Sequence, residues 1–337
     1  MRACFFARVK DPALFDIVDF YRNDIRILGE LGFDVVRARS FSEVPWNCDL
    51  YFTWWWGTGI LSLAKSVPMG RPNVLTGALQ LTPEVDWWQS LGAGKRTVVR
   101  ASLSLATANL AICEVELGYL RELGAPRSRL AYLGVDTDLY RPPAGGGREK
   151  LVVTVSHLTE QNVRRKRLTT VVNAVPLVLA THPDARFQII GERGDGYPVL
   201  ERLARSLRVA DAIEFPGRVS TAEKVRAYQR AQVMAQATIY EGFGMSLAEA
   251  MSCGLPVVTS RRGSVPEVVG TCGRYVEPDD PEAMAREISA LLGNVHAAAE
   301  LGARGRERIV AHFSYEARKR VLAEVVEGAM GSRAPRS

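Results

Sequence analysis

The sequence has few cysteines and histidines, which limits metal and disulfide chemistry. Its 337 residues include five cysteines and four histidines. The cysteines are odd in number, widely separated and never spaced as Cys-x-x-Cys, so neither a disulfide framework nor a zinc site is expected. The histidines also lack the spacing of metal ligands. We therefore expect free, buried thiols in a reducing cytoplasmic environment.

Apolar runs long enough to cross a membrane are also absent, since no stretch reaches the ~18–20 residues that a span requires. The first residues, MRACFFARVK, lack the basic, apolar and small-residue order of a signal peptide and are predicted to form a first strand. A cytoplasmic protein is expected. Peripheral association with the inner face of the membrane stays open, because basic charge attracts anionic lipids.

Acidic residues are outnumbered, with 43 Lys and Arg against 37 Asp and Glu and a net charge of +6. This balance favours anionic partners such as nucleoside diphosphates or an anionic membrane surface. No nucleic-acid partner is expected, because the sequence holds no recognised nucleic-acid-binding motif and no dense run of Lys and Arg. A well-mixed basic surface without a special partner is the alternative.

Strand-like apolar runs alternate with helical patterns along most of the chain, which is typical of parallel α/β proteins. The span 15–31 has helical spacing and is predicted to end at Gly32, whereas Pro176 is predicted to kink or shorten the helix around it. Residues 140–150, YRPPAGGGREK, cannot continue a helix or a central strand and are interpreted as a linker. We predict an α/β fold of two doubly wound, Rossmann-like lobes that bind ligands at the carboxyl ends of their strands.

The segment richest in chemistry is TIYEGFGMSLAEAMSCGLPVVTSRRGSVPEVVG, residues 238–270. Glu241 precedes two glycines, whose lack of a Cβ lets backbone N–H groups approach a ligand. Ser246 is predicted to open a helix, whose first amides and positive dipole end attract an anion. Glu249 supplies a second carboxylate, and carboxylates accept hydrogen bonds from sugar hydroxyls. The segment therefore indicates a nucleotide-sugar site; a surface loop with two solvated glutamates is the alternative.

This segment resembles the signature of the family-4 retaining glycosyltransferases, whose GT-B fold has two Rossmann-like lobes facing each other across a cleft. The resemblance covers most of residues 130–325, and LGVDTDLYRP (133–142) resembles the turn that leaves the first lobe. It implies an N-terminal acceptor-side domain at 1–143 and a nucleotide-sugar-binding domain at 144–312. A C-terminal helix at 313–330 would return to the first lobe.

The resemblance also implies roles for the matching residues. Glu241 would hold hydroxyls of the donor sugar near the reacting carbon, Glu249 would bind the ribose hydroxyls, and Lys166 would neutralise charge on the departing nucleoside diphosphate. The loop PGRVS, with Arg218 and Val219, would read the base mainly through its main chain. Backbone amides for the diphosphate would come from Gly242, Phe243, Gly244, Met245 and Ser246. No metal or other cofactor is implied, since the lysine, the amides and the helix dipole supply positive charge.

One departure from the family pattern concerns a cation of the donor site. Members usually carry an Arg after the strand that opens the second lobe, where this chain has His157, and the loop to Lys166 is longer. Arg164 or Arg165 is the candidate replacement, and we assign Arg165 to the donor site. His157 is a second candidate for phosphate contact; a loop histidine satisfied by the backbone is the alternative.

The other departure concerns a histidine that members usually present in the first lobe. This chain has no histidine before His157, and three successive tryptophans, 54–56, stand where the histidine loop is expected. Trp54, Trp55 and Trp87 are candidates for acceptor contact, because aromatic faces stack on sugar rings. Burial of these rings in the core is the alternative.

These observations together predict a cytoplasmic, retaining glycosyltransferase, a hexosyltransferase of carbohydrate biosynthesis that uses a UDP- or GDP-sugar. Its acceptor would be a carbohydrate, a lipid-linked sugar or a small molecule. Two alternatives stay open. One is a catalytically silent sugar-nucleotide-binding partner of another transferase, for which the missing first-lobe histidine argues. The other is a phosphorylase- or epimerase-like enzyme of similar architecture.

Overall fold

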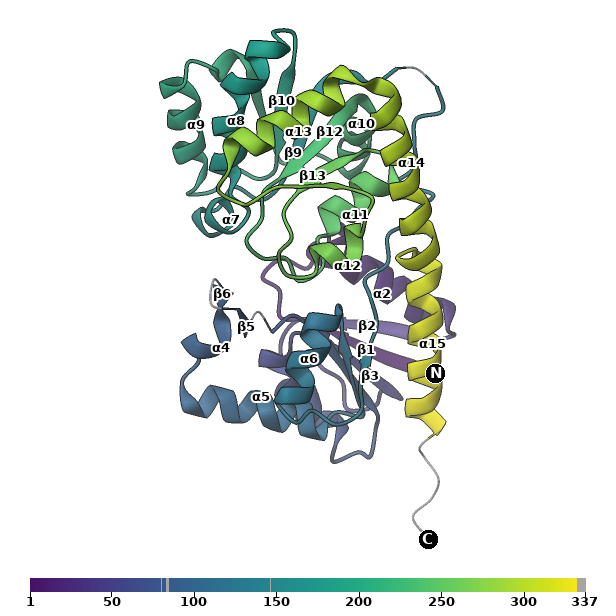
Figure 1. Cartoon of the computed structure of the whole chain (residues 1–337). Helices are drawn as coiled ribbons and strands as arrows, with labels where there is room; N and C mark the ends of the chain where they lie inside the picture. Colours follow the sequence, from purple (N-terminus) through teal and green to yellow (C-terminus); the bar gives the residue numbers. More distant parts are fainter. Residues whose placement is uncertain (80, 83–84, 146, 332–337) are drawn as a thin grey trace. The chain divides into compact units, whose positions relative to one another are not determined.

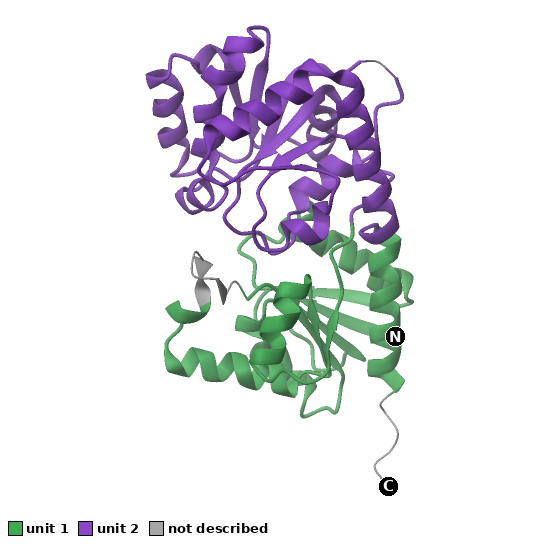
Figure 2. Cartoon of the chain, in the orientation of Figure 1, with its two compact units in different colours: residues 1–134, 315–337 green, residues 135–314 purple. Residues whose placement is uncertain are grey.

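The computed structural model describes residues 1–79, 81–82, 85–145 and 147–331. The chain divides into two compact units: unit 1 comprises Met1–Gly134 with Tyr315–Ser337, and unit 2 comprises Val135–Ser314 (Figure 2). Each unit is built on a six-stranded sheet whose strand pairs are all parallel. The predicted α/β fold of two Rossmann-like lobes is confirmed.

The sheet of unit 1 has the strand order β2-β1-β3-β4-β7-β8. Its first three strands, β2, β1 and β3, are labelled in Figure 1. Every residue of β3 and β4 is buried, as expected for a parallel sheet covered on both faces. The strand order reverses between β1 and β3, and this switch point is where open α/β sheets place their ligands. The strands are β1 (Arg2–Phe6), β2 (Asp34–Ala38), β3 (Leu50–Trp54), β4 (Asn73–Gly77), β7 (Ala108–Ala111) and β8 (Ser128–Leu130).

The helical span predicted near the start of the chain is two helices, separated at Val18, whose backbone is extended. The second helix ends before Gly32, whose φ of 87° suits a glycine as predicted. The sequence analysis did not predict α3 or α5. The remaining elements of unit 1 are α1 (Leu14–Ile17), α2 (Asp19–Glu30), η1 (Trp56–Thr58), α3 (Gly59–Ser66), β5 (Leu81–Thr82), β6 (Val85–Asp86), α4 (Trp87–Ser90), α5 (Ala93–Leu105), α6 (Glu114–Glu122) and α15 (Tyr315–Gly331).

Helix α15, at the other end of the chain, completes unit 1 through a buried ion pair. Arg318 donates to both carboxylate oxygens of Asp24 on α2, at 2.5 and 2.8 Å, and to the carbonyls of Ala131 and Tyr132. Trp54 Nε1 donates to the same carboxylate at 2.9 Å. Both charged side chains are almost fully buried, so the pair ties the last helix to the start of the unit.

The sheet of unit 2 has the order β11-β10-β9-β12-β13-β14, with its switch point between β9 and β12. The core packs against it mainly through α8 and α13. Its strands are β9 (Glu149–Val155), β10 (Arg186–Ile190), β11 (Ile213–Gly217), β12 (Ala231–Gln236), β13 (Val257–Thr259) and β14 (Arg274–Tyr275).

Helix α8 runs through Pro176 without being shortened by it, because its buried side chains pack into the core along its length. No helix in the described part of the chain is both long and apolar enough to cross a membrane. The helices of unit 2 are α7 (Glu160–Arg165), α8 (Leu168–Thr181), α9 (Tyr197–Ser206), η2 (Ala210–Ala212), α10 (Thr221–Arg230), α11 (Met245–Ser252), α12 (Val265–Val269), α13 (Pro281–Gly293) and α14 (Val295–His312).

The segment 135–143, which the sequence analysis assigned to the first lobe, is grouped with unit 2. The amide of Val135 donates to Phe313 O at 2.8 Å. Ser252 Oγ and Arg306 both donate to Tyr140 O, at 2.5 and 3.2 Å. These hydrogen bonds to α11 and α14 hold the segment against the second unit.

Candidate donor-binding site

The predicted glycine loop lies at the carboxyl end of β12, beside the switch point of unit 2. Gly244 has a φ of 88° and precedes α11, which begins at Met245, so the helix starts one residue before Ser246. The first amides of a helix have no intrahelical partner, so those of Met245 and Ser246 point out of its amino end. The predicted helix start after the glycine loop is thus present, and unpaired amides at such a start attract anions.

Glu241 is the centre of a buried polar cluster in this loop. Its Oε1 lies 3.0 Å from Lys166 Nζ, and its Oε2 lies 3.1 Å from Arg165 Nη1. Both cations come from α7 and the residue after it, which follow β9 across the switch point. Of the two arginines considered as replacement cations, Arg165 therefore reaches the site, whereas Arg164 is exposed.

Gln236, the last residue of β12, completes this cluster, and the sequence analysis did not identify it. Its Nε2 donates to Glu241 Oε1 at 2.9 Å. Its Oε1 accepts from Lys166 Nζ at 3.2 Å and from Ser246 Oγ at 3.1 Å. The only sequence signal for it was that it is one of two glutamines in an otherwise apolar strand, since a buried amide requires partners.

The two central charges shift each other's ionisation. Burial acts to raise the pKa of Glu241, but Lys166 and Arg165 outweigh burial and hold that pKa below its ordinary value. Burial lowers the pKa of Lys166, while the Glu241 carboxylate opposes this shift. The carboxylate is therefore ionised at neutral pH and available to accept hydrogen bonds.

The loop 260–264 fixes the backbone of Glu241 from the opposite side. Ser264 donates to Glu241 O through both its amide and its Oγ, each at 3.0 Å. Gly263 has a φ of 56°, and a Cβ on it would lie 2.5 Å from Glu241 O. Only glycine fits this approach, so this loop supports the backbone of Glu241 directly.

Glu249 occupies a separate polar cluster between α10 and α11. Its carboxylate lies 2.9 and 3.0 Å from Lys224 Nζ and accepts a hydrogen bond from Tyr228 OH at 3.1 Å. The side chain is only 4% exposed. The two carboxylates of the motif thus have different cationic partners, and sequence spacing did not indicate Lys224 or Tyr228.

The other predicted donor contacts range from exposed to buried. The side chain of His157 is 69% exposed, with Nδ1 3.8 Å from Glu192 Oε2. Arg218 is exposed and Val219 is half-buried in the loop after β11. Gly242 and Met245 are half-buried, while Phe243 is buried against Phe313, with ring centroids 5.7 Å apart.

The tryptophans after β3 lie at the switch point of unit 1 and are not equivalent. Trp54 and Trp56 are each 1% exposed, which favours the packing alternative for them. Trp55 is half-buried and has a φ of 77°, a conformation that bulky residues rarely adopt. Its Nε1 donates to Tyr21 OH at 2.5 Å. The side chain of Trp87 lies outside the described part of the structure.

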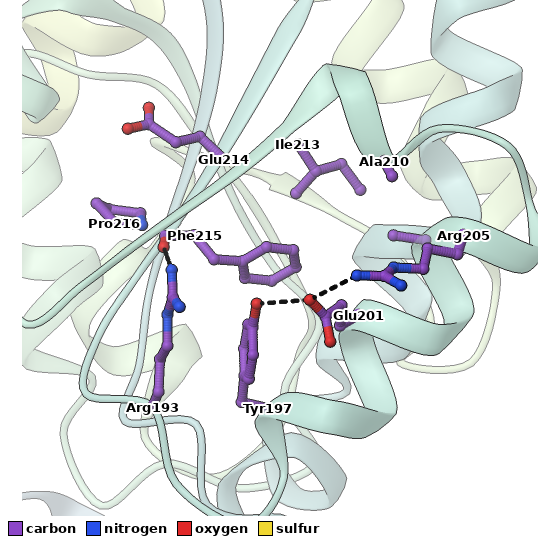
Figure 3. Close-up of a pocket in the computed structure, with 10 residues that line it drawn as sticks. Arg193, Tyr197, Glu201, Arg205, Ala210, Ile213, Glu214, Phe215 and Pro216 are labelled. Carbon is purple, nitrogen blue, oxygen red and sulfur yellow. Dashed lines mark hydrogen bonds and ion pairs between the residues drawn. The ribbon is translucent and has the colours of Figure 1, made fainter.

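Unit 2 also has an open pocket of about 530 Å³ between α9 and β11 (Figure 3). Arg193 and Tyr197 lie at one end of it, with the Phe215 ring near Tyr197. Its polar side chains are paired: Arg193 with Phe215 O, and Glu201 with Tyr197 and Arg205. None of the predicted site residues lines this pocket.

No group of three or more potential metal-ligand side chains occurs within residues 1–79, 81–82, 85–145 and 147–331.

The family match lies within unit 2. Residues 149–294 match the family model described as glycosyl transferases group 1. The fold resembles that of sucrose-phosphate synthase from Thermosynechococcus elongatus, with a TM-score of 0.78, 20% identity and coverage of 98% of this chain and 100% of that one. The resemblance to this family and to its GT-B fold class is thereby confirmed.

Two curated relatives are mannosyltransferases. The MMP alpha-(1->4)-mannosyltransferase of Mycolicibacterium hassiacum is 29% identical over 77% of this chain and 65% of its own length. The GDP-mannose-dependent alpha-(1-6)-phosphatidylinositol monomannoside mannosyltransferase of Mycolicibacterium smegmatis is 30% identical over 60% of this chain and 57% of its own length. The chain thus spans less than two thirds of either relative.

Proposed function

We propose that this chain, whose residues 149–294 match the family model described as glycosyl transferases group 1, is a retaining glycosyltransferase. It moves a sugar from a nucleoside diphosphate donor to an acceptor hydroxyl. The observation that carries the proposal is the buried cluster of Glu241 with Lys166 and Arg165, next to the amino end of α11. A carboxylate for sugar hydroxyls and positive charge for a diphosphate stand side by side there.

The donor is a GDP- or UDP-sugar, and GDP-mannose is the first to test. The support is the name of the GDP-mannose-dependent relative and the family match of the donor-side unit. Because the base is expected to be read by the main chain around Arg218 and Val219, the side chains favour neither base.

In the proposed reaction, the bond between the anomeric carbon and the diphosphate oxygen breaks, and its electron pair stays on the diphosphate. Lys166 and the amides of Met245 and Ser246 offset this developing charge without a metal ion. The acceptor oxygen forms its new bond on the face the diphosphate leaves, so the anomeric configuration is kept. The acceptor proton passes to the departing phosphate oxygen.

The acceptor side is assigned to unit 1, where Trp55 is the proposed contact. Aromatic rings stack on sugar rings, and Trp55 is the partly exposed member of the run 54–56. The strained backbone of Trp55 supports a functional role, because such strain concentrates at functional sites. Carbohydrate, lipid-linked and small-molecule acceptors all fit this ring, and the lipid-linked class would bring the protein to the membrane surface.

A thermal-shift screen with GDP, UDP, ADP, dTDP and their sugars tests the donor proposal. A ligand at a hundred times its dissociation constant adds about 2.7 kcal/mol of stability. Release of GDP from GDP-mannose, unaffected by EDTA, and NMR of the product's anomeric carbon test metal-independent, retaining transfer. Binding without turnover across an acceptor panel would instead favour the silent partner, and no binding would refute a donor site.

A further inference from the structure

Strand β12 buries two glutamines, Gln232 and Gln236, four residues apart on the same strand. A buried amide costs free energy unless its donor and acceptor find partners. Gln232 Nε2 donates to the carbonyls of Leu291 and Leu292, at 2.9 and 3.1 Å. These carbonyls belong to the last turn of α13, where they lack intrahelical partners. Gln232 therefore stabilises the fold by linking β12 to the end of α13.

Gln236 is fully buried, and its partners are all in the candidate donor site. Its N–H end donates a hydrogen bond to the carboxylate of Glu241. Its carbonyl oxygen accepts hydrogen bonds from the ammonium of Lys166 and the hydroxyl of Ser246. Both lone pairs of that carbonyl oxygen are used. No apolar side chain offers these bonds, and a carboxylate cannot donate to Glu241.

We propose that Gln236 is a positioning residue for sugar transfer. It holds the carboxylate of Glu241, proposed to bind the sugar, at a fixed position relative to Lys166 and Ser246, proposed to bind the diphosphate. The proposal rests on the function proposed above. The sugar hydroxyls of a bound donor would hydrogen-bond to Glu241, in competition with the N–H end of Gln236. The phosphates of the donor would bind Lys166 and Ser246, in competition with the carbonyl end of Gln236. The Gln236 amide contacts both Glu241 and the pair Lys166 and Ser246. It therefore fixes their relative positions while a donor binds and a nucleotide leaves. Small displacements of such groups reduce rates strongly.

The charged groups around Gln236 are Glu241 on the loop after β12, Arg165 and Lys166 at the end of α7, and Glu249 on α11, which also acts on Lys166. A carboxyl group at position 236 would stand beside Glu241 and Lys166. When ionised, it repels Glu241. When protonated, its O–H donates to Glu241 as the amide does, while its carbonyl still accepts from Lys166.

The test compares Gln236→Leu and Gln236→Glu with the matched control Gln232→Leu, which removes a buried amide from the same strand. The measurements are GDP release from GDP-mannose and from UDP-glucose, GDP affinity by calorimetry, and thermal unfolding. Gln236→Leu is expected to lower kcat about 100-fold, with a smaller change in KM and in GDP affinity. Gln232→Leu is expected to lower the melting temperature while leaving kcat unchanged.

The pH profile separates positioning from folding. The activity of Gln236→Glu, relative to wild type, is expected to rise as the pH is lowered from about 8 to about 6, as its carboxyl group becomes protonated beside Glu241. A constant activity ratio across this range overturns the positioning role. So does a Gln236→Leu variant with wild-type kcat.

Failure of the proposed function gives a different result. A wild-type protein that unfolds cooperatively but binds neither GDP nor UDP, and releases no nucleotide from either donor, overturns both proposals. A wild-type protein that turns over donor while Gln232→Leu and Gln236→Leu lose kcat equally overturns the assignment of Gln236 alone.

Discussion

The two units place their buried charge differently although their sheets are built alike. In unit 2 the carboxyl end of β12 leads into the ionic cluster of Glu241, Lys166 and Arg165. In unit 1 the corresponding switch point, after β3, has the aromatic side chains of Tyr21, Trp54 and Trp55. The switch point of the same kind of sheet can thus carry either buried charged side chains or aromatic ones.

Unit 1 also contains a buried ion pair, but it joins secondary structure elements. Asp24 and Arg318 lie 294 residues apart in the chain, and Arg318 makes its other hydrogen bonds to carbonyls. In unit 2 the buried carboxylate is surrounded by groups that a ligand would engage. Variants of these residues should therefore separate stability from function.

The largest loss of stability is expected for the variant Asp24→Asn, because it leaves Arg318 buried without its counter-charge. We expect a loss of about 3–5 kcal/mol in the free energy of unfolding, measured in urea. Asp16→Asn is the control, because its pair with Arg37 is exposed and should contribute less than about 1 kcal/mol. Equal losses in the two variants would contradict the structural role of the buried pair.

Glu241→Gln is expected to lower transfer at least about 100-fold, since the neutral amide replaces the carboxylate proposed to hold the donor sugar. Because the pKa of Glu241 is held below its usual value, the stability this group contributes is present at neutral pH and lost as the pH falls below about 4.5. The difference in melting temperature between wild type and variant should therefore narrow on acidification. Near-normal turnover would remove Glu241 from the site.

Two variants should affect donor binding and acceptor binding separately, namely Lys166→Met and Trp55→Leu. Losing one charged contact to phosphate is expected to weaken GDP binding about tenfold or more in Lys166→Met. Trp55→Leu should leave GDP affinity unchanged and raise the KM for the acceptor. Calorimetry and steady-state kinetics check both, and a loss of GDP affinity in Trp55→Leu would be against the acceptor-side assignment.

The smallest change in the free energy of unfolding is expected for Arg230→Ala. Its guanidinium donates twice to Glu149, both at 2.8 Å, with both side chains more than half exposed. Exposed pairs contribute about 0–1 kcal/mol even with good geometry. Urea unfolding should therefore place this variant near wild type, in contrast to Asp24→Asn.

Local sequence patterns predicted much of the fold. Apolar runs predicted strands, Gly32 marked the end of a helix through its backbone freedom, and the helix predicted to open at Ser246 begins one residue earlier, at Met245. Helices α3 and α5 were not predicted, and neither begins with a residue whose side chain caps the helix. Pro176 was expected to disturb α8, but burial along the helix outweighed its local preference.

The sequence by itself determined two α/β lobes and a glycine loop that leads from a strand into a helix start, because periodicity and turn chemistry are local properties. Only the tertiary structure decided that Arg165 pairs with Glu241, that Gln236 joins Lys166 across 70 residues, and that Trp55 alone of its run is partly exposed. The physical reason is that these contacts depend on the order of strands in each sheet. That order brings β9 beside β12, and it is set by packing of the whole unit.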